Sequence, residues 1–146
     1  MTIPQDFQPH FRKSPVTDPW EPLFSRIREG AADLLFEVGP AHCNSRGFLH
    51  GGVLATLCDN AMGLSLGLSL RQDAPRVVTI TLSLDYTGSA QLGDTVIIEP
   101  RVIRAGSSIG FCDALVRAGA LVIARANATF RVQQPTSDGT TSGSRH

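Results

Sequence analysis

Apolar side chains occupy nearly every position of residues 51–70, without the polar stripe that marks a surface helix. A helix that is apolar on all sides is normally buried in a protein core. A single carboxylate, Asp59, interrupts this run, and burial of an unpaired carboxylate costs several kcal/mol unless a partner compensates it. The pattern therefore predicts a long central helix with one polar position that calls for a functional reason.

Five segments carry the pattern of β-strands. The clearest is 78–86, where apolar residues alternate with Thr79, Thr81, Ser83 and Asp85, as in a strand with one buried face: Val78, Ile80, Leu82, Leu84 and Tyr86. The other predicted strands span 34–38, 95–104, 109–117 and 121–132. The last four of the five strands in chain order are joined by short turns, which predicts an antiparallel meander. One curved antiparallel sheet wrapped around the central helix, an α+β fold, is the economical packing.

A short amphipathic helix is predicted ahead of the first strand. Asp18 suits the N-cap and Pro19 the first helical position, and Gly30 suits the end. Between them, apolar residues recur at helical spacing: Trp20, Leu23, Phe24 and Ile27.

The two ends of the chain lack such periodicity. Residues 1–16 predict an irregular arm, and residues 133–146 predict a disordered tail because they offer almost nothing to bury. A length of 146 residues suits one domain, which is expected over 17–132.

Composition narrows the class of protein. Thirteen basic side chains balance thirteen acidic ones, which gives no net attraction to nucleic acid or to an anionic membrane. The one segment long enough to suggest a membrane span, 51–70, contains Asp59 and Asn60 and is better suited to a protein interior. The three cysteines have no paired spacing, and the first ten residues lack the pattern of a signal peptide, so reduced thiols in the cytoplasm are expected.

A spaced motif precedes the central helix. Asn44, Gly47, His50, Gly51 and Gly52 are followed by Asp59, nine residues after the histidine. The motif resembles the hotdog-fold thioesterases, in particular the phenylacetate-degradation-type and mammalian thioesterase superfamily branch. The resemblance extends over about residues 30–132, through segments 84–86, 90–94, 104–107 and 124–130. It implies a hotdog fold and hydrolysis of an acyl- or aryl-CoA thioester to the free acid and coenzyme A, without a cofactor.

The start of the predicted helix suits an oxyanion site. The first backbone N–H groups of a helix have no partner within it, and they lie at the positive end of the helix dipole. Gly51 and Gly52 would let a thioester carbonyl approach these groups closely. The glycines could instead serve only a tight entry into the helix.

Asp59 could act as a general base on water or attack the thioester directly to form an anhydride. Eight residues separate it from Gly51, about 12 Å along a helix. One carbonyl cannot touch both, so joint action requires Gly51 of one subunit and Asp59 of another. A homodimer or a dimer of dimers is therefore expected. Alternatively, Asp59 is a helix carboxylate held by a neighbouring hydroxyl such as that of Thr56.

The resemblance places Asn44, His50 and Gly51 on one side of the site and Asp59 and Thr79 on the other. Thr79 would orient the attacking water, with Thr81 as its rival. Asn44 would bond the carboxylate or fix its loop. His50 is expected to orient or cap the turn more than to transfer protons.

Substrate contacts are expected at two further places. Gly63 and Gly67 either admit a strand close to the helix or make room for an acyl group. Arg104, Gly106 and Ser107 fall in a turn where related enzymes contact coenzyme A.

Other chemistry finds less support in the sequence. Cys58 has no histidine at a spacing that would suit a catalytic pair, so we interpret it as a small hydrophobic core residue. No cluster of histidine, cysteine or glutamate has the spacing of metal ligands, so no metal is predicted. Two alternative functions remain: an acyl-CoA-binding module without catalysis, and an enoyl-thioester hydratase or dehydratase, which would need a histidine and a carboxylate at one site.

Overall fold

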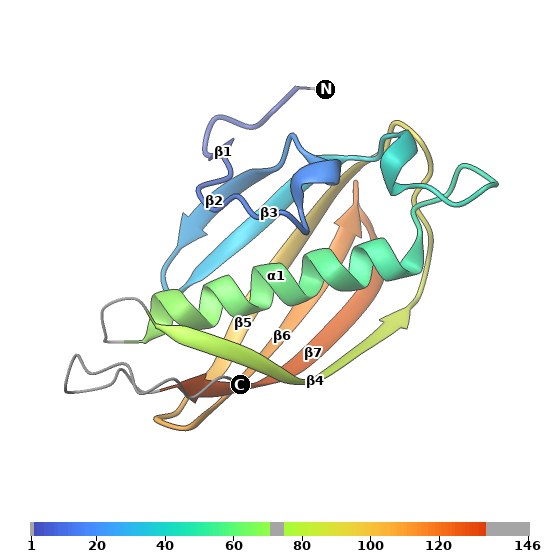
Figure 1. Ribbon diagram of the computed structural model, residues 1–146. Helices are drawn as coiled ribbons and strands as arrows, with labels where there is room; N and C mark the ends of the chain where they lie inside the picture. Colours follow the sequence, from blue (N-terminus) through green and yellow to red (C-terminus); the bar gives the residue numbers. More distant parts are fainter. Residues whose placement is uncertain (1, 71–74, 134–146) are drawn as a thin grey trace.

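A single long helix crosses one face of a curved antiparallel sheet in the computed structural model, which describes residues 2–70 and 75–133 (Figure 1). Helix α1 spans Gly51–Ser69, as the apolar run predicted. The described strands are β1 Gln8–Pro9, β2 Phe24–Arg28, β3 Ala31–Glu37, β4 Arg76–Tyr86, β5 Thr95–Ala105, β6 Ile109–Ala118 and β7 Leu121–Gln133. Two short 3-10 turns, η1 Asp18–Trp20 and η2 Pro40–His42, precede the helix. This is the predicted α+β hotdog fold.

The sheet order is β1-β2-β3-β5-β6-β7-β4, and every pair of neighbours is antiparallel. The antiparallel prediction is confirmed, but the four strands after the helix do not form a simple meander. Strand β4 pairs with β7 at the edge of the sheet, while β5 lies beside β3. Residues 87–94 therefore carry the chain from the β4 edge to β5 in the middle of the sheet.

The helix predicted from Asp18 to Gly30 is wrong. Only η1 is helical, and the residues after Pro22 form β2, which pairs with β3. Proline has no N–H to donate within a helix, and it drives the residue before it towards extended conformations. Glu21 accordingly has φ −68° and ψ 149°. The helical spacing of the apolar residues was outweighed by this one proline.

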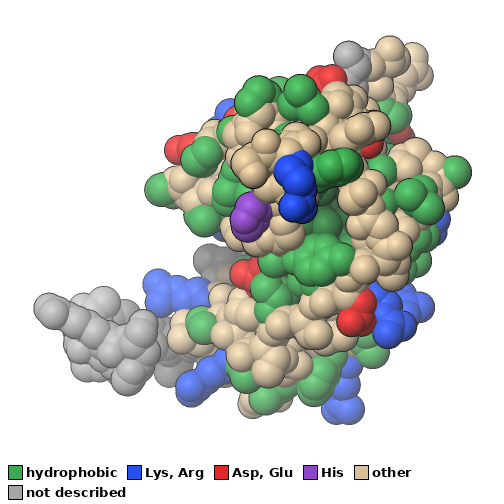
Figure 2. Space-filling model, turned by 90° about the vertical axis from the view of Figure 1, so that its right-hand side faces the viewer, with side chains coloured by type: hydrophobic (Ala, Val, Ile, Leu, Met, Phe, Trp, Pro, Cys, Tyr) green, Lys and Arg blue, Asp and Glu red, His purple; other side chains and the backbone are tan. Residues whose placement is uncertain are grey.

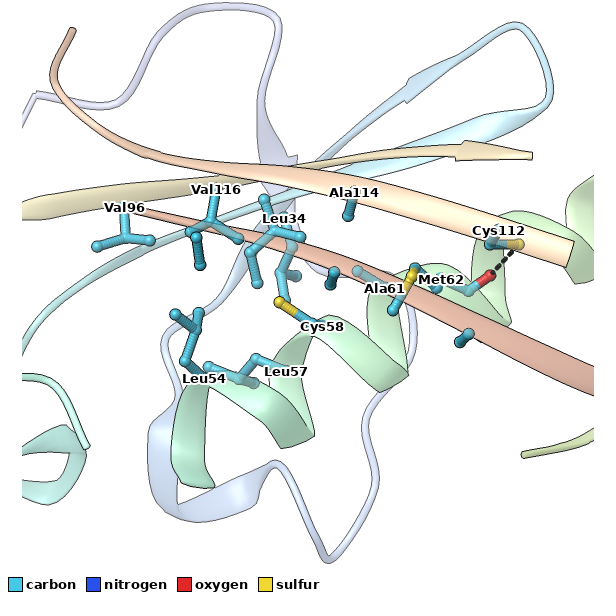
Figure 3. Packing of buried hydrophobic residues seen from close by; sticks show 14 of the residues in the cluster. Leu34, Leu54, Leu57, Cys58, Ala61, Met62, Val96, Cys112, Ala114 and Val116 are labelled. Atoms are coloured by element: carbon cyan, nitrogen blue, oxygen red, sulfur yellow. Dashed lines mark hydrogen bonds between the residues drawn. The ribbon is translucent and has the colours of Figure 1, made fainter. Parts of the chain in front are cut away.

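The core lies between α1 and the sheet. Figure 3 shows side chains of α1 facing those of β3, β5 and β6, namely Leu54, Leu57, Cys58, Ala61 and Met62 against Leu34, Val96, Cys112, Ala114 and Val116. The helix approaches β6 closely at Gly110, where an added Cβ would lie 2.4 Å from Leu66 Cδ2. This packing fixes the position of α1, and with it the direction in which the residues of its remaining faces point.

Strand β4 departs from the predicted alternation. Its register with β7 shifts between Thr79 and Thr81, which leaves Ile80 in an irregularity of the β-bulge type. Directly paired residues of neighbouring strands share a face. Thr79 pairs with buried Phe130 and Leu82 with buried Ala128, so both lie on the helix side of the sheet. The expected face therefore holds for Leu82, Leu84 and Tyr86 but is wrong for Val78 and Ile80.

The ends of the chain differ in part from the prediction. The arm expected to be irregular over 1–16 contains β1, which pairs with β2. Gln133, the first residue of the predicted tail, closes β7, and residues 134–146 lie outside the described residues. Within the described parts of the chain, no helix is long and apolar enough to cross a membrane.

Candidate active site

Asp59 and Thr79 are joined by a hydrogen bond between α1 and β4. The Thr79 hydroxyl donates to Asp59 Oδ1 at 2.7 Å. Asp59 is half-buried, and the Thr79 hydroxyl is the kind of compensating partner that the sequence pattern called for. Thr56, the alternative partner, donates instead to the carbonyl oxygen of Gly52 at 3.0 Å. Thr81 pairs with Thr129 beyond the bulge, so the structure favours Thr79 as the hydroxyl of the site.

The Asp59–Thr79 pair lines a cleft of about 710 Å³ between α1, the start of β4 and the N-terminal arm. Most of its lining is apolar or glycine: Phe11, Gly63, Leu64, Gly67, Leu68, Pro75, Val77, Val78 and Phe130. Its polar lining residues are Arg12, Asp59, Asn60, Arg76, Thr79 and Gln133. The cleft therefore offers an apolar trough with a carboxylate and a hydroxyl on its wall.

Gly63 and Gly67 both face this cleft. A Cβ at Gly63 would meet Phe130 at 3.5 Å and Val77 at 3.6 Å, and one at Gly67 would meet Pro75 at 3.7 Å. These are ordinary van der Waals contacts, so neither glycine is forced by a clash. Both glycines line the cleft and lie close to residues of the sheet side, which leaves the two roles expected of them open.

The N-terminal end of α1 is capped by His50. The His50 Nδ1 atom accepts a hydrogen bond from Gly52 N–H at 2.9 Å, as predicted for a capping role. The N–H of Gly51 has no acceptor among the described residues, so it is the available donor at this helix end.

Tyr86 holds Gly51 from the other side. Its hydroxyl donates to Gly51 O at 2.6 Å, and an added Cβ at Gly51 would lie 3.2 Å from the tyrosine ring. Burial, with a smaller contribution from Cys58, raises the pKa of the Tyr86 hydroxyl, which keeps it protonated as a donor. The sequence pattern marked Tyr86 only as a strand residue. In the sequence, the position of Tyr86 at the end of a predicted strand was the only sign of this role.

Asn44 fixes its own loop. Its side-chain oxygen accepts from Arg46 N–H at 2.9 Å and from Phe48 N–H at 3.2 Å, and Gly47 in the same loop has φ +82°. Of the two roles expected for Asn44, the structure shows the second. Asn44 does not contact Asp59 within one chain, because the two line different clefts.

Gly51 and Asp59 are likewise separated. Gly51 lines a second cleft of about 370 Å³ together with Asn44 and Tyr86, and this cleft shares no lining residue with the first. Figure 2 shows hydrophobic side chains gathered around a hollow on the end of the molecule where α1 begins. The structure of one chain thus holds Gly51 and Asp59 in two separate clefts.

The predicted coenzyme A turn joins β5 and β6. An added Cβ at Gly106 would lie 2.5 Å from Ile109 O, so the turn requires glycine there. Arg104 and Ser107 are exposed. None of these residues lines the Asp59 cleft, and the structure does not bring them to the site within one chain.

Cys58 points into the core shown in Figure 3, away from the cleft. Burial, aided by the neighbouring Asp59 charge, raises the pKa of its thiol to about 12. Such a thiol stays protonated and is a poor nucleophile, in agreement with the sequence interpretation. Among the described residues, no group of three or more histidine, cysteine, aspartate or glutamate side chains is placed to hold a metal ion.

Comparison with known proteins places these features in a family. The family profile described as "Thioesterase superfamily" matches residues 46–130. The Pseudomonas aeruginosa protein named "Putative esterase PA0474" is 34% identical over 134 residues, which cover 90% of this chain and 98% of that protein. Human acyl-coenzyme A thioesterase 13 is 35% identical over 75 residues, 51% of this chain and 52% of the human protein.

Solved structures agree with the sequence relatives. The crystal structure of smu.793 from Streptococcus mutans bound to acetyl CoA matches with a TM-score of 0.65 and 31% identity, over 71% of this chain and 82% of that one. Fold and sequence thus define a hotdog-fold thioester hydrolase. The chain belongs to the thioesterase superfamily, which confirms the resemblance carried by the motif before the helix.

Proposed function

We propose that this protein hydrolyses acyl-CoA thioesters to the free acid and coenzyme A, at sites formed by two copies of the chain. The observation that carries the proposal is the hydrogen bond between Thr79 and Asp59 in a mainly apolar cleft. Similarity to a human acyl-CoA thioesterase and to a structure bound to acetyl CoA supports coenzyme A as the thiol carrier. The chemistry requires no cofactor.

The edge of the sheet supports a dimer. Strand β4 is an edge strand of eleven residues, and four of its large apolar side chains are exposed: Val78, Ile80, Leu82 and Tyr86. A long apolar edge strand is a template for pairing with another strand. Antiparallel pairing of β4 with the β4 of a second copy is a two-fold arrangement in which the same surface serves both subunits.

Such pairing would join the two half-sites. In a register centred on Ser83, with Ile80 as the extra residue of the bulge, Thr79 would lie opposite Tyr86 of the partner subunit. Tyr86 is bonded to Gly51, so the partner's Gly51 N–H would arrive beside Asp59 and Thr79. A dimer of dimers would repeat the same unit.

The reaction follows from these positions. The Gly51 N–H binds the thioester carbonyl oxygen and stabilises the oxyanion that forms on it. Asp59 removes a proton from a water molecule oriented by Thr79, and the water oxygen bonds to the carbonyl carbon. The carbon–sulfur bond then breaks, the proton passes from Asp59 to the leaving thiolate, and the acid and coenzyme A depart.

The alternative use of Asp59 as a nucleophile gives an anhydride with the acyl group, which water then cleaves. Both routes need Asp59 and the same oxyanion donor. A single turnover in isotopically labelled water tests for the anhydride. Label found in Asp59 shows an anhydride cleaved at the Asp59 carbonyl, whereas label in the product acid alone arises from the base route and also from an anhydride cleaved at the acyl carbonyl.

The remaining predicted contacts are assigned to binding. Gly63 widens the acyl trough, and Gly52 keeps the helix start open, where a Cβ would crowd the His50 ring at 3.1 Å. Arg104 near the end of β5, with Gly106 and Ser107 in the turn after it, is suited to contact the phosphates or pantetheine of coenzyme A. The free thiols of Cys58 and Cys112 agree with a cytoplasmic location, which we include in the proposal.

The test is thiol release from short, long and aryl acyl-CoAs, followed with a thiol reagent. Turnover of at least one class supports the proposal. Binding of acyl-CoA without thiol release would favour the non-catalytic module instead. Loss of the double-bond absorbance of a crotonyl thioester, without thiol release, would favour a hydratase, although His50 is engaged as a helix cap.

A further inference from the structure

The N-terminal arm forms part of the wall of the Asp59 cleft through Phe11 and Arg12. These residues lie outside the region that carries the family resemblance. The segment before them is fixed to the sheet, because β1 pairs with β2 and His10 N–H donates to Leu23 O at 2.9 Å. Phe11 and Arg12 therefore stand next to the cleft on an anchored segment.

Contacts on both sides of the segment hold it in place. Before it, the Arg26 guanidinium bonds Asp6 at 2.9 Å and lies 4.6 Å from the centre of the Phe7 ring. After it, Thr17 is fully buried in a turn, and Trp20 Nε1 donates to Ala41 O at 3.2 Å. The arm is thus built into the fold on both sides of the cleft wall.

His10 packs the arm against the turn of α1 that carries Asp59. It is only 5% exposed, and its ring lies 5.0 Å from that of Phe11. Burial lowers the pKa of His10, and an interaction with the side chain of Asn60 opposes this shift, so the two residues are neighbours. Asn60 follows Asp59 directly in the sequence, so the position of the arm is coupled to the position of the catalytic carboxylate.

The cleft has more positively charged than negatively charged lining residues. Arg12 and Arg76 line it, and Asp59 is its single acidic lining residue. In the described part of the chain, the guanidinium group of neither arginine has a hydrogen-bond or ion-pair partner, although the backbone of Arg76 pairs with Gln133 in the sheet. Arginine presents a planar fork of donors that matches carboxylate and phosphate groups. In an otherwise apolar cleft, these two side chains are the groups able to recognise an anion.

We propose that Arg12, together with Arg76, binds an anionic group of the thioester substrate and thereby sets substrate preference. This inference rests on the proposed function of the same cleft. The anion is either a carboxylate on the acyl group or a phosphate of coenzyme A, which share the same recognition chemistry. Phe11 packs beside it against the apolar part of the substrate.

The experiment compares four thioesters: a neutral acyl group and an acyl group with a terminal carboxylate, each on coenzyme A and on pantetheine. Pantetheine lacks the phosphates. Steady-state kinetics are measured for wild type, Arg12→Gln and Arg76→Gln. The control is Lys13→Gln, because Lys13 is an adjacent exposed cation that does not line the cleft. Melting temperatures verify that all variants are folded.

Recognition of a phosphate predicts a KM about ten-fold or more higher for Arg12→Gln on both coenzyme A thioesters, with pantetheine thioesters unchanged. Recognition of a carboxylate predicts the same loss on both carboxylated thioesters, with neutral ones unchanged. Arg76→Gln is expected to show the same selectivity. Added salt should weaken the wild-type preference and have less effect on the variants.

Equal effects on all four thioesters, no effect on any, or an equal loss in Lys13→Gln would overturn the proposal. Absence of thiol release by the wild type on all four would instead contradict the proposed function. In that case, calorimetric binding of the same thioesters to wild type and Arg12→Gln still decides the role of the arginine. Equal affinities would refute it, and a selective loss of affinity would support it.

Discussion

Thr79 Oγ1 lies 2.7 Å from Asp59 Oδ1, which joins the edge strand of the sheet to the middle of the central helix. If this hydroxyl orients the carboxylate and its water, Thr79→Val should lower kcat about ten- to a hundred-fold and leave KM nearly unchanged, on the scale of a positioned proton-transfer group. Thr79→Ser keeps the hydroxyl and should retain most of the activity. Equal losses in both variants, measured by thiol release, would show that the methyl group matters and the hydrogen bond does not.

The Gly51 N–H is expected to be the oxyanion donor, and its position as the first residue of α1 allows a direct test. Proline is well accepted at the first helical position and has no N–H. Gly51→Pro should therefore lower kcat by about 10²- to 10³-fold, as for the loss of one oxyanion-hole donor. Gly51→Ala is the matched control, since it keeps the N–H and adds a Cβ that meets Tyr86 at 3.2 Å. A smaller loss in the alanine variant supports the donor role, and equal losses point to crowding against the tyrosine.

Sites shared between two subunits predict complementation between inactive variants. A heterodimer of Asp59→Asn and Gly51→Pro chains has one site with both substitutions and one with neither. Random mixing makes half of the dimers heterodimers, so about a quarter of wild-type activity should return. The measurement is thiol release after unfolding and refolding the two proteins together. No recovery, with dimers present by light scattering, would place Gly51 and Asp59 in the same subunit's site.

The edge strand is expected to be the subunit interface. Leu82→Lys places a charge on the exposed apolar edge of β4 and should yield monomers with little activity. Ile27→Lys is the control, because Ile27 is also exposed but lies in β2, near the opposite edge of the sheet. Sedimentation velocity reports the oligomeric state. A Leu82→Lys protein that stays dimeric and active would rule out pairing through β4.

Stability should fall as the pH drops below the ordinary histidine pKa of 6.5. Burial lowers the pKa of His42, and its Nδ1 accepts from Gly39 N–H at 3.0 Å, so the folded state favours the neutral ring. Burial also lowers the pKa of His10. The unfolded chain then binds more protons in this range, so acidification favours unfolding. Melting temperatures of wild type should decline from pH 7.5 to pH 5, and those of His42→Gln should decline less steeply.

The central helix and its motif were readable from sequence for clear physical reasons. An all-round apolar run of the length of α1 has no stable place except a core, and His50 with two glycines marks its start. The rise per residue of a helix then gives the distance between Gly51 and Asp59 from the sequence alone. Local pattern and global fold agree in this part of the chain.

Other parts depended on tertiary contacts that the pattern does not carry. The bulge at Ile80 adds one residue to β4, so the alternation before it is out of step with the alternation after it. As a result, Thr79 lies on the helix side of the sheet together with Leu82. Alternation alone put the two on opposite faces. Arg12 reaches the cleft through pairing of β1 with β2, a contact between segments with no sequence signature. In both places, pairing between strands distant in the sequence sets where the side chain lies, and local periodicity does not carry that information.

The most direct test of the account is thiol release by Asp59→Asn on the best acyl-CoA substrate of the wild type. Asparagine preserves size and can still accept the Thr79 hydrogen bond, so the fold and the dimer should persist. We predict that kcat falls by about 10²- to 10⁴-fold while acyl-CoA still binds, because the carboxylate that deprotonates the water or attacks the thioester is gone. Hydrolysis at the wild-type rate by folded, dimeric Asp59→Asn protein would contradict it.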